Sequence, residues 1–125
     1  MTDQLISFET AKLAKEKGFN IPVHGMYVEK GYEPQNYPEP NESAYNWNSR
    51  SGYSAPTQSL LQKWLREKHN IHFVIKIFYD SKLHKTTYTA DPIELGQGRT
   101  KRILPQDTYE EALEAGLIEA LKLIS

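Results

Sequence analysis

Apolar residues recur at three- and four-residue spacing near the end of the chain, which predicts an amphipathic helix in the segment 107–125. Thr108 and Glu111 have the spacing of a capping box, in which each side chain accepts a hydrogen bond from a backbone N–H at the helix start. Further apolar residues widen the face, so we expect the helix to be buried in the core or packed against a second copy in a two-fold dimer. The main apolar positions are Tyr109, Ala112, Leu113, Gly116, Leu117, Ala120, Leu121 and Ile124.

Two earlier segments also have helical signals. The first begins at a Ser7 cap and ends near Lys17, where Gly18 suits the left-handed conformation that terminates many helices. The second opens at residues 54–56, because proline is tolerated in the first turn of a helix. Its apolar residues keep helical spacing as far as residues 69–70, where Asn70 is expected to end it.

Residues 71–79 alternate between two faces with the period of a β-strand. We expect the first face to meet helices, and the second, of mixed polarity, to be half-exposed. A short connection leads to a β-branched run at residues 85–90, which predicts a hairpin. Residues 91–92 are expected to end that strand, and residues 92–106 to form a loop. The first face carries Ile71, Phe73, Ile75 and Ile77.

The segment 31–53 has an unusual composition. It contains three of the seven prolines, four tyrosines and a tryptophan, but no Leu, Ile, Val or Met. A loop of this length is uncommon inside a compact domain, and a purely flexible linker should be poor in aromatic residues. We therefore expect the segment to be pinned to the domain, with a short strand near residues 45–47.

With a further strand predicted at residues 23–30, the order is helix, strand, long loop, helix, strand, strand, helix. This order favours an α+β fold in which a small, mainly antiparallel sheet of three to four strands packs with three helices. The length of 125 residues predicts a single domain, residues 1–125.

Composition and charge exclude several kinds of site. The chain has no cysteine, which excludes disulfides, thiolate zinc sites and cysteine nucleophiles. The formal net charge of −1 gives no overall attraction to nucleic acid or to an anionic membrane. We see no signal peptide and no apolar run long enough for a membrane span, so we expect a cytoplasmic protein without membrane partners.

The sequence predicts no catalytic, cofactor-binding or metal-binding residue. His69 and His72 are three residues apart, but they straddle a helix-to-strand junction and no third ligand is evident. The pair Gly96 and Gly98 falls short of a dinucleotide-binding fingerprint. A small hydrolytic enzyme, using His72 with a carboxylate of the long loop, is the least favoured of three functional hypotheses.

The leading hypothesis is a non-enzymatic protein-binding module that contacts its partner through Tyr45, Trp47, Arg50 and Tyr53. Tyrosine, tryptophan and arginine dominate interface hot spots because they combine a large contact area with a polar group. The structural alternative is that these rings only cover a sheet edge or the first helix.

A nucleic-acid-binding protein is the second hypothesis. Arg99, Lys101 and Arg102 could contact phosphates, with Tyr79 or Tyr88 offering a stacking surface. The lack of surplus positive charge argues against it.

Three stretches of the sequence, residues 6–19, 54–72 and 109–124, together resemble a group of small proteins of unknown function encoded by bacteriophages and prophages of gut anaerobic bacteria. The stretch 54–72 is the most specific of the three. The resemblance implies an origin in a phage or mobile element, and a small protein that acts by binding a host or viral component. It implies no activity, cofactor or catalytic residue.

Overall fold

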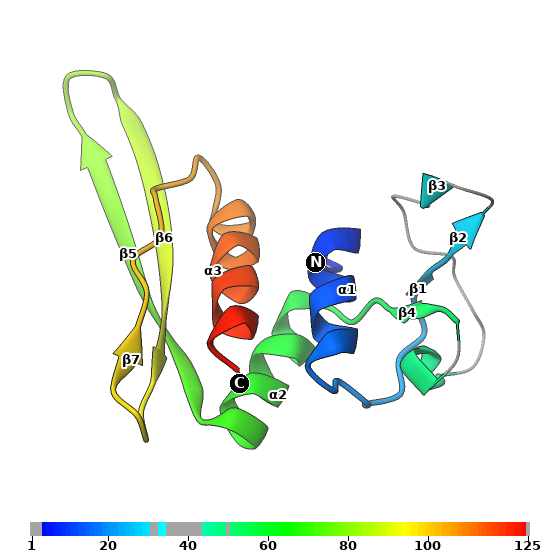
Figure 1. Cartoon of the computed structure of the whole chain (residues 1–125). Coiled ribbons are helices and arrows are strands. Elements are labelled where there is room, and N and C mark those ends of the chain that lie inside the picture. Colours follow the sequence, from blue (N-terminus) through cyan, green and yellow to red (C-terminus); the bar gives the residue numbers. More distant parts are fainter. Residues whose placement is uncertain (1–3, 31–32, 35–43, 50, 125) are drawn as a thin grey trace. The chain divides into compact units, whose positions relative to one another are not determined.

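The computed structural model describes residues 4–30, 33–34, 44–49 and 51–124. Within these residues the chain has an α+β fold, as the sequence predicted, with helices and antiparallel strands (Figure 1). The chain divides into two compact units, residues 1–61 and 62–125, whose boundary falls within the second helix. The elements in order are α1 (Phe8–Glu16), β1 (Met26–Tyr27), β2 (Glu29–Lys30), β3 (Glu33–Pro34), the 3₁₀ helix η1 (Trp47–Ser49), β4 (Tyr53–Ser54), α2 (Gln58–His69), β5 (Ile71–Asp80), β6 (Lys85–Glu94), β7 (Arg99–Thr100) and α3 (Tyr109–Leu123).

In the first unit, α1 begins and ends where its signals predicted. The Ser7 hydroxyl accepts the N–H of Thr10 at 3.3 Å, and Gly18 has a φ of 91° just after the helix. The thin apolar stripe of α1 is buried, and the Phe8 ring packs against Tyr27 at 5.4 Å between centroids. The Tyr27 hydroxyl is also buried and donates to the carbonyl of Ile6 at 2.7 Å.

The strand predicted over residues 23–30 is broken into short pieces. Val23 forms an isolated bridge with Tyr45, β1 pairs with β4, and β2 pairs with β3. Next to the β1–β4 pairing the carbonyl of Gly25 accepts the N–H of Ala55 at 2.9 Å, and a Cβ on Gly25 would lie 2.9 Å from the carbonyl oxygen of Ala55. The strand predicted at residues 45–47 is reduced to that single bridge followed by η1.

The predicted start of the second helix, with a cap at residue 54 or 55, was two to three residues early. Residues 53–54 form β4, and the carbonyl of Pro56 accepts the N–H of Ile6 at 3.0 Å. The helix instead begins at Gln58, where the hydroxyl of Thr57 accepts the N–H of Leu60 at 3.2 Å. Its predicted end is confirmed, because Asn70 has a left-handed φ of 55° directly after the last helical residue.

In the second unit, β5 and β6 form the predicted hairpin, with the register Ile71↔Glu94 to Asp80↔Lys85. The prediction that β6 ends at residues 91–92 was wrong, because β6 continues to Glu94 and then pairs with β7. The carbonyl of Pro92 accepts bonds from the β7 side, from Lys101 N–H at 3.2 Å and the Thr100 hydroxyl at 3.0 Å. The missing N–H of Pro92 therefore faces away from β5, so the proline removes no bond of the β5–β6 ladder.

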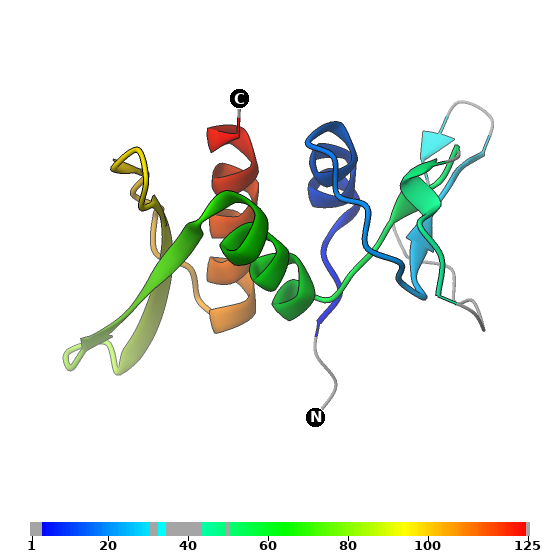
Figure 2. The same cartoon turned by 90° about the horizontal axis from the view of Figure 1, so that it is seen from below.

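Helix α3 covers one face of this sheet (Figure 2). The predicted cap is confirmed, since the Thr108 hydroxyl accepts the N–H of Glu111 at 3.1 Å and donates to its carboxylate at 2.9 Å. The helix packs mainly against β6, where a Cβ on Gly116 would overlap the carbonyl oxygen of Ala90. The buried stripe is Ala112, Leu113, Gly116, Leu117, Ala120 and Leu121.

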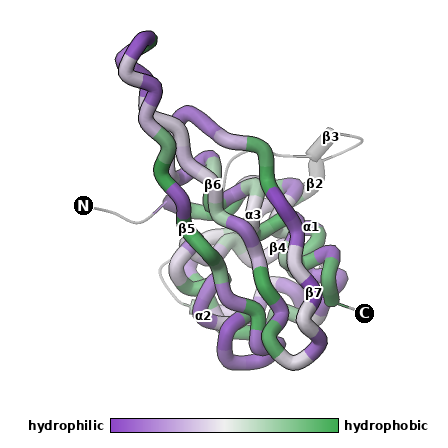
Figure 3. Tube along the Cα trace, turned by 90° about the vertical axis from the view of Figure 1, so that its left-hand side faces the viewer, coloured by the Kyte–Doolittle hydropathy of each residue, from purple (hydrophilic) through white to green (hydrophobic). Residues whose placement is uncertain are grey.

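The apolar face of β5 is only partly covered. Ile71 is fully buried, whereas Ile75 is 38% exposed and Ile77 is 67% exposed. The expectation that this whole face meets helices is therefore wrong. The turn of the hairpin extends beyond the N-terminal turn of α3 (Figure 1). Hydrophobic positions continue along β5 in this uncovered part (Figure 3).

Candidate functional site

The predicted aromatic segment is held by contacts within the first unit. The indole N–H of Trp47 donates to the carbonyl of Val23 at 2.9 Å, and Tyr45 exchanges two backbone bonds with Val23 at 2.9 and 3.0 Å. The Tyr45 and Trp47 rings lie 5.1 Å apart. Trp47 is half-buried and Tyr45 is exposed, so this pair leaves one ring accessible.

Tyr53 lies between two residues of α1. Its ring meets Phe8 edge-on at 5.2 Å, and the Lys15 ammonium lies 4.7 Å above it while donating to the Gly52 carbonyl at 2.9 Å. Arg50 falls outside the described residues. These contacts give Trp47 and Tyr53 a structural role, and a partner surface over residues 45–53 stays a prediction.

The basic cluster is divided between a paired and an exposed part. The guanidinium of Arg99 binds the carboxylate of Glu94 through two hydrogen bonds of 2.8 Å. These bonds hold the pKa of Glu94 below its ordinary value and raise that of Arg99. Lys101 and Arg102 are exposed. Arg99 is thus already bound by a carboxylate of its own chain, whereas the other two cations of the cluster are exposed.

The ring Nε2 of His72 lies 3.1 Å from the amide oxygen of Asn70. The hydrolase hypothesis uses a carboxylate of the long loop 31–53, where Glu39 and Glu42 lie outside the described residues and Glu33 is described only in its backbone. Among the residues that the structure describes, no group of three or more His, Asp or Glu side chains could hold a metal ion.

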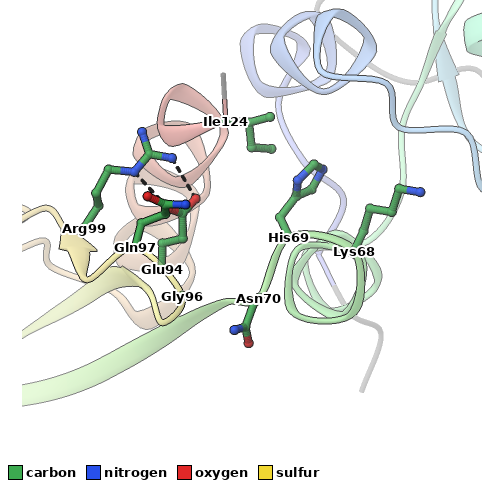
Figure 4. A pocket seen from close by; sticks show the side chains of 8 residues that line it. All are labelled: Lys68, His69, Asn70, Glu94, Gly96, Gln97, Arg99 and Ile124. Atoms are coloured by element: carbon green, nitrogen blue, oxygen red, sulfur yellow. Dashed lines mark hydrogen bonds and ion pairs between the residues drawn. The ribbon is translucent and has the colours of Figure 1, made fainter.

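A polar cavity of about 490 Å³ opens in the second unit beside the end of α2 (Figure 4). On one wall His69 packs edge-on against Trp64 at 4.8 Å, and its buried Nε2 has no hydrogen-bond partner among the described residues. Burial, followed by the charge of Lys68, lowers the pKa of His69 below 6.5 and favours the neutral ring. The lining residues are Lys68, His69, Asn70, Glu94, Gly96, Gln97, Arg99 and Ile124.

This cavity was missed in the sequence because its walls come from distant segments, and His69 alone indicated only a helix end. The cavity is lined both by His69, whose pKa is lowered, and by the ion pair formed by Glu94 and Arg99. The lining contains no hydroxyl or thiol side chain.

Among the described residues, more than half of the exposed large hydrophobic side chains lie in the distal half of the β5–β6 hairpin. Ile75, Ile77 and Tyr79 occupy one face of β5, and Val74 and Phe78 occupy the other. Proteins seldom expose several large apolar side chains close together unless these side chains contact something else. The exposed side chains are Val74, Ile75, Ile77, Phe78, Tyr79 and Leu83.

Comparison with known proteins identifies no relative: no protein-family model, no curated protein and no solved structure matches the chain. No helix in the described part of the chain is both long enough and apolar enough to cross a lipid bilayer. Function must therefore be inferred from the exposed surfaces and the cavity themselves.

Proposed function

We propose that the chain is a non-enzymatic protein-binding module of phage or mobile-element origin that acts in the cytoplasm. Its principal contact surface is the distal half of the β5–β6 hairpin, residues 74–83. The proposal rests on the exposure of five large apolar side chains on the paired, regular backbone of β5, with Leu83 exposed in the adjoining turn. The origin rests on the resemblance of residues 6–19, 54–72 and 109–124 to phage-encoded proteins.

Hydrophobic burial provides the driving force for such binding. Transferring an exposed side chain the size of Ile77 or Phe78 fully out of water contributes about 1.5–3 kcal/mol. The continuous pairing of β5 with β6 holds these side chains in place before a partner arrives, which reduces the conformational entropy lost on binding. Aromatic residues such as Phe78 and Tyr79 are also the types that dominate interface hot spots.

The two alternatives have weaker support. Nucleic-acid binding would depend on Lys101 and Arg102, because Arg99 is engaged by Glu94. Hydrolysis would require His72 to meet a carboxylate of the long loop, and its ring Nε2 lies 3.1 Å from the amide oxygen of Asn70.

A capture experiment with the tagged full chain tests the proposal. We expect a specific set of proteins to be retained from host lysate with or without nuclease, and to be lost with Ile77→Lys. Leu104→Lys is the matched control, because Leu104 is 80% exposed in the same unit but lies outside the hairpin. Retention that is unchanged by Ile77→Lys, or that disappears with nuclease, would overturn the proposal.

A further inference from the structure

We propose that the hairpin also binds a second copy of this chain, through antiparallel pairing of the free edge of β5 with β5 of the other copy. This inference rests on the proposed function, because both use the same hairpin. The strand order β5-β6-β7 places β5 at the edge of its sheet. Within the described residues of the second unit, no strand pairs with the outer edge of β5.

The hydrogen bonds around the sheet show which backbone groups lie at that free edge. The carbonyl of Asn70 accepts the N–H of Leu95 at 3.1 Å, so even-numbered positions of β5 direct their backbone groups toward β6. On β6 the same alternation means that even-numbered residues direct their backbone groups away from β5. Tyr88 follows it, because its backbone exchanges two hydrogen bonds of 2.9 Å with Gln106. The odd-numbered residues therefore present N–H and C=O groups outward. In the exposed half of the strand they are Ile75, Ile77 and Tyr79.

Strand β5 lacks most of the features that prevent edges from pairing. Such features are proline, bulges, several charges or a short length. The register of β5 with β6 is continuous over ten residues without a bulge, and the strand contains no proline and one lysine. An edge with these properties is a template for another strand.

The charged residues of β5 favour a second copy of the chain as the partner, and they favour one register of the β5–β5 pairing. In a two-fold antiparallel pair, a symmetry axis at Lys76 would place the two lysines opposite each other, which is unfavourable. An axis at Phe78 instead places each Lys76 opposite Asp80 of the other copy. It also pairs Ile77 with Tyr79 and Phe78 with itself, so the most exposed apolar residues of β5 meet one another.

The existing contacts of the two charged residues permit this pairing. The Lys76 ammonium lies 3.8 Å from Asp91 Oδ2 and is half-exposed, so it can also approach a second carboxylate. Asp80 uses Oδ1 to accept the N–H groups of Lys82 and Leu83, and these bonds do not use Oδ2.

The ladder would cover residues 76–80 of each copy, about half of β5. Such an interface falls at the low end of specific interfaces, at or below about 1,200 Å² of total buried surface. We therefore expect a concentration-dependent equilibrium between monomer and dimer at micromolar concentrations.

Cysteine crosslinking of the full chain tests the register directly, because the natural chain has no cysteine. In Phe78→Cys the two thiols would occupy directly opposed positions, with Cβ atoms about 4.5–5.5 Å apart, close to disulfide distance. In Val74→Cys, on the same face of the same strand, the two positions would lie about 27 Å apart along the ladder. We expect Phe78→Cys to form a covalent dimer at least about ten-fold faster under mild oxidation, as the opposed geometry requires. Equal rates for the two variants would overturn the proposal.

Sedimentation of the reduced, unmodified chain over a concentration series tests the charge pairing. Lys76→Glu should weaken the dimer, and the double variant Lys76→Glu/Asp80→Lys should restore it. Lys101→Glu is the matched control, with the same charge change at an exposed position outside β5. Circular dichroism verifies that each variant is folded. A wild type that stays monomeric at several hundred micromolar, or a double variant no better than Lys76→Glu, would overturn the pairing.

Failure of the dimer proposal can be distinguished from failure of the proposed protein-binding function. A monomeric chain whose capture of another protein is still lost with Ile77→Lys would refute the second copy as partner and leave the binding function intact. A monomeric chain whose capture ignores Ile77→Lys would refute both.

Discussion

Replacement of Gly116 by alanine should destabilise the second unit although alanine is the better helix former. The propensity difference alone would stabilise α3 by about 1 kcal/mol. Against this, the new Cβ would overlap the carbonyl oxygen of Ala90 and lie 3.2 Å from the Phe73 ring. Overpacking a core typically costs about 1–3 kcal/mol, and a backbone carbonyl cannot move away by changing rotamer. Subtracting the propensity gain from the cost of overpacking, we expect a net loss of up to about 2 kcal/mol.

Denaturant unfolding of the full chain, followed by far-UV circular dichroism, measures this loss. Gly96→Ala is the matched control, since a Cβ at Gly96 has no atom within 4 Å and its backbone is not left-handed. That variant should change the unfolding free energy by no more than a few tenths of a kcal/mol either way. Stability of Gly116→Ala equal to or above that of Gly96→Ala would refute the close packing of α3 on β6.

Two further predictions concern the aromatic segment and the cavity. Trp47→Phe keeps an aromatic ring but loses the hydrogen bond from the indole N–H to a backbone carbonyl. The unfolding free energy should therefore fall by about 0.5–1.5 kcal/mol. An unchanged denaturation midpoint would contradict the structural role of Trp47. For His69, the pKa in the folded state lies below 6.5, so the unfolded state binds the proton more tightly. The free energy of unfolding should therefore fall as the pH drops below 6.5 toward the folded-state pKa. This component should be absent in His69→Gln, and equal pH dependence in both proteins, measured by denaturation at several pH values, would contradict it.

Locally encoded features of the fold were predictable from the sequence. The caps at Ser7 and Thr108, the left-handed Asn70 and the β5–β6 hairpin depend on residues close to one another in the chain, and the structure has all of them. The end of β6 was not predictable in this way. Whether a proline terminates a strand depends on which neighbour its missing N–H faces, and at Pro92 that neighbour is the segment around β7.

The candidate binding surfaces show the same contrast between features encoded locally in the sequence and features that depend on distant segments. The residue types at positions 45–53 indicate an interface, but they do not show that Trp47 bonds to Val23 or that Tyr53 lies against Phe8. The cavity beside His69 depends on Glu94 and other residues that are distant in sequence, which spacing alone cannot bring together.

The exposed hairpin follows from a mismatch in length between α3 and the strands it covers. Helix α3 has 15 residues and spans about 22 Å at 1.5 Å per residue, whereas β5 has 10 residues and spans about 33 Å at 3.3 Å per residue. Gly116 fixes the helix against β6 near Ala90, so the distal strands extend past it. Because the anchor and the exposed half are separate, Gly116→Ala should lower the unfolding free energy without changing the dimer dissociation constant of the folded chain. A coupled change in both would mean that α3 controls the hairpin edge as well as the core.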